Sequence, residues 1–142
     1  MRILHFLAIV ICFNSCNKNL HEQFDLKINE VAFLEDDKSY LESIEIYNPH
    51  NFTAQIDSIH LLIDEAKFEI KNLKSINPGQ IIFREIKKTI NNRDFKIKLN
   101  INGNTVDEFQ WKSSKKRAYI GRYPDGSKLI VPMTSRSLGK TN

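Results

Sequence analysis

The sequence predicts an all-β fold, a small β-sandwich or barrel. Short apolar runs alternate with polar residues at a two-residue period, and Asn, Pro and Gly separate these runs as turn residues do. No window of ten or more residues combines a 3.6-residue apolar period with helix caps. With 142 residues, of which 41% are hydrophobic and 27% charged, the chain has room for one globular domain with a core.

Residues 43–49 predict the central core strand. Ile44 and Ile46 fall on one face of a two-residue period, and Asn48-Pro49 ends the strand as a turn would. We expect about seven further short strands to form the walls around it, and no helix.

An irregular strand is predicted upstream. Leu26 and Ile28 share one face, whereas Val31 and Phe33 have the opposite parity. A regular strand cannot bury both pairs, because a one-residue shift turns every side chain to the other face. We therefore expect a β-bulge or a bend at Asn29-Glu30.

The middle of the chain predicts three strands. Residues 35–39 form a charged loop before the central strand, and 59–63 alternate with one clean apolar face. A short strand follows at 68–70, and 77–79 is an Asn-Pro-Gly turn. Residues 81–83 are apolar on both faces, which predicts an interior strand.

A β-hairpin is predicted over residues 95–111. Its centre is Asn102-Gly103, a pair favoured in two-residue type I′ turns because both positions need positive φ. With the turn there, Leu99 pairs with Val106 on the core face.

The same hairpin requires one extra residue further from the turn. Regular pairing would set Ile97 and Phe95 against polar residues. An extra residue at Asp107-Glu108 brings Ile97 opposite Phe109 and Phe95 opposite Trp111, so we expect a second β-bulge there.

Two short strands, 118–120 and 129–132, complete the predicted fold. Between them lies 121–126, with Pro124 suited to the second position of a type I turn and Gly126 to the fourth.

The N-terminus has the features of a bacterial lipoprotein signal peptide. Arg2 is followed by an apolar run over residues 3–13, too short to span a bilayer, and then by Ser15-Cys16. We expect cleavage after residue 15 and lipidation of Cys16. The alternative is an ordinary secretory signal with a chance cysteine.

The cysteine count agrees with attachment. Both cysteines, Cys12 and Cys16, lie in this segment, so the mature domain has none to pair with Cys16. Asn17 after the cysteine favours an outer-membrane destination, periplasmic or at the cell surface. We expect a signal peptide at 1–15, a lipidated tether at 16–23 and one domain at 24–142.

Five motifs in order resemble the lamin tail domain family. The resemblance covers residues from about Leu26 to the end of the chain. The motifs are Ile28-Asn29-Glu30-Val31, Ile44-Glu45-Ile46-Tyr47-Asn48-Pro49, Asn77-Pro78-Gly79-Gln80, Gly121-Arg122-Tyr123-Pro124-Asp125-Gly126 and the closing Ser137-Leu138-Gly139-Lys140-Thr141-Asn142.

The resemblance implies an immunoglobulin-like β-sandwich that serves as an interaction module and has no catalytic site common to the family. We expect the charged and polar motif residues to be structural, because charges next to a core need partners. Arg122 would pair with a carboxylate, and Asn29 or Asn48 would close turns. The full set is Asn29, Glu30, Glu45, Asn48, Gly121, Arg122, Pro124, Asp125 and Gly126.

Catalytic and metal-binding patterns were considered and set aside. Ser58 and His60, with Asp57 or Asp64, suggest a hydrolytic triad, but the first two project side by side from one strand face. Acidic residues could bind calcium, although a solvated charged loop is the usual reading. They are Glu35, Asp36 and Asp37, with Asp64 or Glu65. We expect no catalytic residue, metal or cofactor.

A basic run is the candidate for binding polyanions or anionic lipid headgroups. Its alternative is a solvated loop between two strands. The run is Lys112, Lys115, Lys116 and Arg117, flanked by Trp111 and Tyr119, with Lys87, Lys88 and Arg93 elsewhere. The net charge of +4 does not require a nucleic-acid partner.

These observations favour a lipid-anchored, non-enzymatic binding module of the bacterial envelope, with a protein or glycan partner. One alternative is an accessory domain or enzyme acting on nucleic acid or phosphate esters at the cell surface. Another is a structural envelope protein that only packs against other subunits. Asn51-Phe52-Thr53 is a formal glycosylation sequon without expected meaning here.

Overall fold

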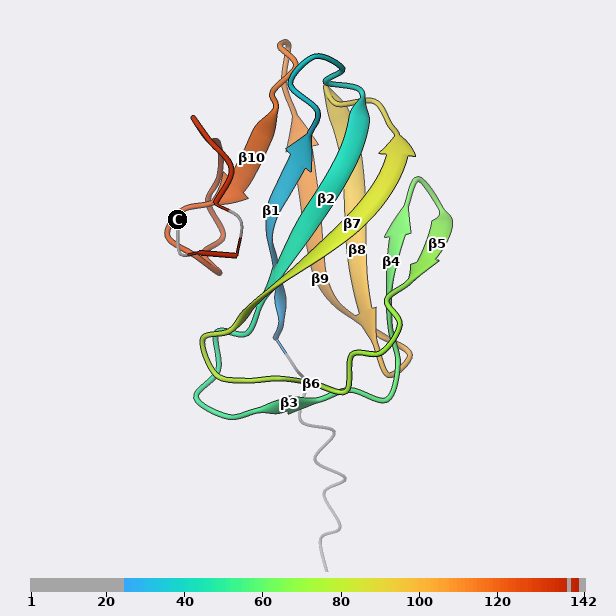
Figure 1. Ribbon diagram of the computed structural model, residues 1–142, viewed down its shortest axis with the longest axis vertical. Helices are drawn as coiled ribbons and strands as arrows, with labels where there is room; N and C mark the ends of the chain where they lie inside the picture. Colours follow the sequence, from blue (N-terminus) through green and yellow to red (C-terminus); the bar gives the residue numbers. More distant parts are fainter. Residues whose placement is uncertain (1–24, 138, 141–142) are drawn as a thin grey trace, which may run out of the picture.

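The computed structural model describes residues 25–137 and 139–140, which contain eleven strands and no helix. The expected signal peptide and tether lie outside these residues. The strands are β1 (Lys27–Phe33), β2 (Tyr40–Tyr47), β3 (Ala54–Gln55), β4 (Ile59–Ile63), β5 (Ala66–Glu69), β6 (Ser75–Ile76), β7 (Ile81–Thr89), β8 (Asp94–Ile101), β9 (Asn104–Lys112), β10 (Tyr119–Arg122) and β11 (Ile130–Pro132) (Figure 1).

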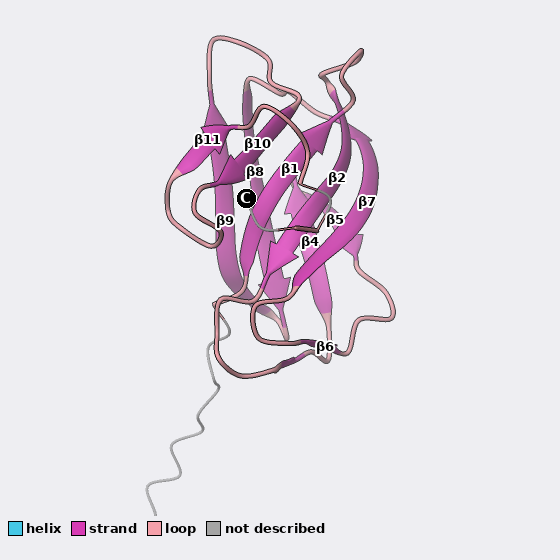
Figure 2. Ribbon diagram, turned by 60° about the vertical axis from the view of Figure 1, so that its left-hand side comes forward, coloured by secondary structure: helices cyan, strands magenta, loops and turns pink. Residues whose placement is uncertain are grey.

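Two antiparallel sheets face each other across a shared core. One has the order β11-β10-β1-β2-β7 and the other β5-β4-β8-β9, while β3 and β6 pair at one end (Figures 1 and 2). The all-β prediction is confirmed, and two open sheets around one core are consistent with a β-sandwich. Sequence reasoning missed β3 and β6, because two residues are too few to show a period.

The core is one continuous cluster of side chains from both sheets. Alternation works as expected: in β4, Ile59, Leu61 and Ile63 are buried, whereas the residues between them are half-buried. Beside β4 in the same sheet, β8 turns Phe95, Ile97, Leu99 and Ile101 inward. The first sheet contributes Leu26, Ile28, Val31, Phe33, Leu41, Ile44, Ile46 and Ile82.

The bulge predicted in the first strand is confirmed. Ile28 pairs with Ile46 and Glu30 with Glu45, so Asn29 is the extra residue between two regular stretches. The shift turns Val31 inward along with Ile28, and both are fully buried. Asn29 is thereby left out of the β1–β2 ladder.

The strand predicted at the centre is β2, and it is an interior strand between β1 and β7. It begins three residues earlier than residue 43 and ends at Tyr47, before Asn48-Pro49. The middle of the five strands is β1, so the description of β2 as central was one position off.

The prediction that residues 81–83 lie in an interior strand is wrong. They begin β7, which pairs only with β2 and forms an edge of its sheet. Its outer face is nevertheless covered, because the Arg136 guanidinium lies 5.0 Å from the centre of the Phe83 ring. Residues 81–83 can therefore be apolar on both faces although β7 has a hydrogen-bonded neighbour on one edge only.

The β8–β9 hairpin has the predicted turn but a different bulge. Asn102 and Gly103 have φ values of 50° and 84°, and Ile101 pairs with Asn104 across them. The predicted pairs Ile97–Phe109 and Phe95–Trp111 are confirmed.

The extra residue of β9 is Val106, not one at Asp107-Glu108. Asn100 pairs with Thr105 and Leu99 with Asp107, so the predicted Leu99–Val106 pair is wrong. Moving the bulge towards the turn places Asp107 on the same face as Phe109. Because the bulge was predicted at the wrong position, the inward orientation of the Asp107 carboxylate was not predicted.

The turn after β10 also differs from expectation. The Ser127 N–H donates to Pro124 O at 3.0 Å, so Pro124 is the first residue of the turn and Gly126 the third. A third position with φ of +70° favours glycine. The Gly126 N–H donates instead to the side chain of Asn29, which makes this turn part of a longer-range contact.

Candidate functional site

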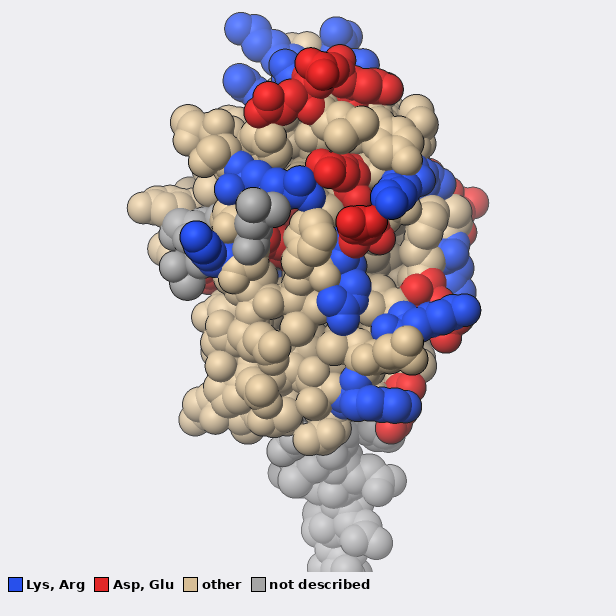
Figure 3. Space-filling view, in the orientation of Figure 1, with Lys and Arg blue, Asp and Glu red and all other residues tan. Residues whose placement is uncertain are grey.

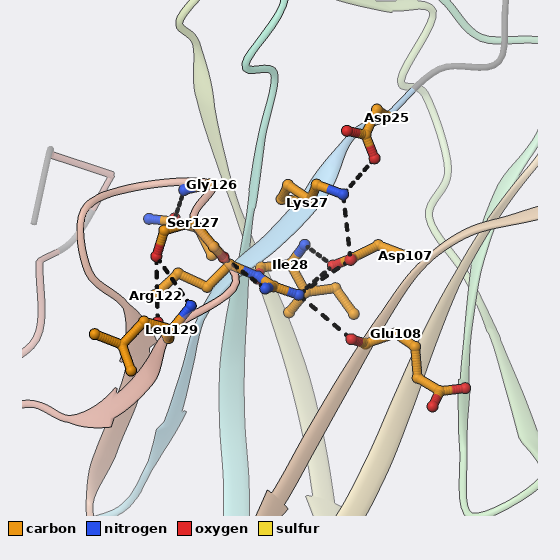
Figure 4. A network of polar contacts seen from close by, with 10 residues as sticks. Asp25, Lys27, Ile28, Asp107, Glu108, Arg122, Gly126, Ser127 and Leu129 are labelled. Carbon is orange, nitrogen blue, oxygen red and sulfur yellow. Dashed lines mark hydrogen bonds and ion pairs between the residues drawn. The ribbon is translucent and has the colours of Figure 1, made fainter.

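The motif residues of the sequence meet in two buried charged clusters around β1. The first, the interlayer ion pair, consists of Arg122 and Asp107, whose side chains are 5% and 7% exposed. The Arg122 Nη2 donates to both Asp107 carboxylate oxygens at 3.0 Å. Its other nitrogens donate to the backbone, Nε to Ile28 O at 2.9 Å and Nη1 to Ser127 O at 2.6 Å (Figure 4).

The interlayer ion pair joins the two sheets. Arg122 comes from β10, beside β1, whereas Asp107 comes from β9 in the other sheet. Asp107 also accepts the Ile28 N–H at 2.8 Å, and the guanidinium carbon lies 5.6 Å from the centre of the Phe109 ring. Lys27 adds a second cation 3.7 Å from Asp107. Each charge is thus compensated in place, as burial requires.

Arg122 was expected to pair with a carboxylate, but its partner was not identified from the sequence. A signal was present, since Asp107 shares the parity of Phe109 and Trp111 in β9. If the alternation of Phe109 and Trp111 is extended to residue 107, the Asp107 side chain faces inward and Val106 becomes the extra residue.

The second cluster, the carboxylate pair, consists of Glu30 and Glu45. They are Cα partners across β1 and β2, on the sheet face turned away from the core, and are 1% and 2% exposed. The closing segment, by which we mean residues 135–137 and 139–140, covers them: the Ser137 N–H donates to Glu30 at 3.1 Å, and the Ser137 hydroxyl to Glu45 at 2.9 Å. The Gly139 N–H also donates to Glu45.

Burial raises the pKa of both Glu30 and Glu45, because it penalises the charged form more than the hydrogen bonds to the closing segment favour it. The charge of Glu45 adds to the rise in the pKa of Glu30. Two carboxyl groups of raised pKa therefore lie side by side beneath the backbone N–H groups of Ser137 and Gly139.

Arg136 fastens the closing segment beside this pair. Its Nη1 donates to Glu42 at 3.0 Å and its Nη2 to the Ser43 hydroxyl at 2.6 Å. The guanidinium also stacks on Phe83, so Arg136 contacts both β2, through Glu42 and Ser43, and β7, through Phe83. Neither Arg136 nor Glu42 was singled out from the sequence, because nothing local to residue 136 indicates where it packs.

The two asparagines of the motifs organise loops. Asn29 donates to Asp125 at 2.7 Å and accepts the Gly126 N–H at 3.0 Å, which ties the turn after β10 to the bulge of β1. Asn48 donates to the carbonyls of Phe52 and Ile76 and so links the loop after β2 to β6.

The residues of the basic run are exposed, but they share their end of the domain with acidic residues. Figure 3 shows Lys and Arg side by side with Asp and Glu at the top of the view. Lys112 lies 3.4 Å from Asp94, and Tyr119 donates to Glu35 at 2.9 Å. Hydrogen bonds from Ser39 lower the pKa of Asp37, with a smaller contribution from the charge of Lys116.

The neighbours of the basic run do not form a stacking platform. Trp111 packs half-buried against the core, and Tyr119 is engaged by Glu35. Asn92 holds the run in place through the backbone N–H and carbonyl of Arg117, both at 2.8 Å. The structure therefore presents a fixed surface of mixed charge, not a basic groove.

The other cationic residues named from the sequence are Lys87, Lys88 and Arg93. Arg93 adjoins the run, because its carbonyl accepts the Ser113 N–H at 2.8 Å. Lys87 pairs with Glu85 at 2.9 Å, and the Lys88 ammonium lies 5.3 Å from the centre of the Phe68 ring. Lys87 and Lys88 are thus engaged by partners outside the run, whereas Arg93 lies beside it.

The residues considered as a triad make other contacts. The His60 Nε2 lies 3.1 Å from the Asn100 amide nitrogen, and burial lowers the pKa of His60. Ser58 donates its backbone N–H to Asn102 at 3.0 Å. Over residues 25–137 and 139–140 no group of three or more His, Cys, Asp or Glu could hold a metal ion, so the candidate calcium ligands are not assembled there.

Comparisons with protein-family models, with curated proteins and with solved structures find no match. Within the described part of the chain no helix is long and apolar enough to cross a membrane.

Proposed function

We propose that this protein is a lipid-anchored, non-catalytic interaction module of the bacterial cell envelope, with an immunoglobulin-like sandwich of the lamin-tail type. The observation that carries the anchor is Ser15-Cys16, placed directly after a short apolar run in a chain whose only other cysteine is Cys12. Two or three acyl chains on Cys16 would hold the domain persistently at a membrane, since each buried methylene contributes roughly 0.8 kcal/mol.

Contacts between distant motifs support the lamin-tail type. Asn29 of the first motif bonds Asp125 and Gly126 of the fourth. Glu30 and Glu45, from the first and second, bind the backbone of the closing motif. Residues that resemble a family pattern thus depend on one another in space, as they would if the pattern encoded a common fold.

The positions of the buried charged groups support a non-catalytic role. Arg122 and Asp107 bridge the sheets, and the carboxylate pair holds the closing segment. His60 is turned to Asn100. Binding would then use the outer surface and loops, where such folds carry variable residues.

Intact-mass analysis of the membrane fraction tests the anchor. Wild type should give the mass of a chain beginning at Cys16 plus acyl chains, and Cys16→Ser should lose both processing and the membrane fraction. Cys12→Ser is the matched control and should behave as wild type. An unmodified soluble wild-type product would refute the anchor and make a secreted binder or enzyme the leading hypothesis.

A further inference from the structure

One end of the domain carries no charged side chain over two long runs. Residues 47–56 and 75–81 contain no Lys, Arg, Asp or Glu, in a chain that is 27% charged. They form the loop after β2, the β3–β6 pair and the start of β7. We call these two runs the charge-free end; Figure 3 shows the lower left of the molecule without Lys, Arg, Asp or Glu.

The charge-free end is also where the described chain begins. In Figure 1, β1 starts beside β3 and β6, at the end opposite to the loop between β9 and β10. The Asp25 N–H donates to His50 Nε2 at 2.9 Å, and the His50 ring stacks on Phe52 with centroids 4.6 Å apart. The chain therefore enters the domain in direct contact with the charge-free end.

Sequence length limits how far this end could lie from an anchor at Cys16. Eight residues, 17–24, separate Cys16 from Asp25, which at full extension span about 30 Å. The basic run begins at Lys112, the last residue of β9, at the far end of a strand of nine residues or about 30 Å. The anchor thus favours contact of the membrane with the charge-free end and directs the basic run away from it.

The chemistry of the charge-free end suits a lipid headgroup region. Exposed Pro49, Asn51 and Gln55 and half-buried Tyr47 and Phe52 can enter it without removing a charge from water. Lys74, whose carbonyl accepts the Ile56 N–H at 2.8 Å, adds a cation at the margin that suits lipid phosphate.

We propose that the charge-free end rests on the lipid surface to which Cys16 anchors the chain, and that the mixed-charge end faces away from it. This inference rests on the proposed lipid anchor. The sequence suggested the basic run as the surface that binds lipid headgroups. The structure instead favours the charge-free end for that contact.

The test uses the mature chain, residues 16–142, in which Cys16 is the single thiol. Coupling it to a maleimide lipid in phosphatidylcholine vesicles reproduces the anchor chemically. Hydrogen–deuterium exchange is compared with the same protein blocked at Cys16 and free in solution. We expect protection of 47–56 and 75–81 on vesicles, and unchanged exchange over 113–117.

Matched substitutions locate the contact. Asn51→Glu and Gln55→Glu, both at exposed positions, should each reduce or abolish the protection, whereas Ser114→Glu at the opposite end should leave it intact. Unchanged exchange in the charge-free end, or protection of 113–117, would overturn the proposal. Absence of acylation in cells would refute the anchor instead, so the two failures are distinguishable.

Discussion

The interlayer ion pair and the carboxylate pair bury charge in opposite ways. Arg122 and Asp107 have opposite charges and compensate each other between the sheets. Glu30 and Glu45 have like charges and depend on donors from the closing segment. The first cluster therefore stabilises the packing of the two sheets, whereas the second makes the closing segment necessary to the sheet that it covers.

Breaking the ion pair should have the largest effect. Asp107→Ala leaves the Arg122 guanidinium buried without its carboxylate, and we expect a loss of about 3–5 kcal/mol in the free energy of unfolding. Urea denaturation monitored by tryptophan fluorescence measures it. The neighbouring Glu108→Ala is the control, because the exposed Glu108–Lys96 pair should contribute no more than about 1 kcal/mol. Equal losses in the two variants would contradict the assigned role.

Replacing both charges should recover much of that loss. In Asp107→Leu with Arg122→Met no charge remains buried at the junction, and apolar replacements of buried ion pairs are often neutral or stabilising. The hydrogen bonds from Arg122 to Ile28 and Ser127 are also lost, so we expect recovery to be partial. A double variant less stable than Asp107→Ala would show that these backbone contacts outweigh the charge pairing.

A smaller effect is expected at the carboxylate pair. Ser137→Ala removes the hydroxyl donor of Glu45 and should cost about 1 kcal/mol. Amide exchange of the closing segment should accelerate at the same time. Ser135→Ala, at an exposed position of the same segment, is the control and should change neither quantity.

The carboxylate pair should also give a distinctive pH dependence. Burial raises the pKa of Glu30 and Glu45 above the ordinary value of 4.5. The folded state then binds these protons more tightly, so their contribution to stability is present below pH 4.5 and is lost as pH rises through the raised pKa.

Glu45→Gln isolates this dependence, since glutamine remains neutral. The free energy of unfolding of the variant minus that of wild type should become more positive between pH 4 and pH 7, whatever its absolute value. A difference that becomes more negative over that range would show that the closing segment stabilises the charged form of Glu45.

Local chemistry made much of the fold predictable. The parity change from Ile28 to Val31 located the bulge at Asn29, because side chains on a strand alternate strictly. Asn102-Gly103 located the hairpin turn, because positive φ at two successive residues restricts the choice of amino acids. Both signals lie within a few residues of the feature they specify.

The errors concern pairing between distant segments. The extra residue of β9 was assigned to Asp107-Glu108 and not to Val106, because either placement gives the pairs Ile97–Phe109 and Phe95–Trp111. The contacts of Asp107 with Arg122 and Ile28 distinguish the two placements. Apolar residues on both faces of β7 predicted two neighbouring strands, whereas Arg136 of the closing segment covers its outer face. Arg136 is 53 positions from Phe83 in the sequence, so it leaves no trace in the local periodicity of β7.

Local features of the sequence were enough to predict that this chain is all-β and where its main turns lie, and they include Cys16 directly after a short apolar run. Periodicity, turn propensity and the position of a cysteine are local properties, which the order of residues carries completely. The tertiary structure alone decided which carboxylate meets Arg122, that Glu30 and Glu45 become neighbours under the closing segment, and that two charge-free runs share one end. Those outcomes depend on how strands far apart in the chain pair and pack.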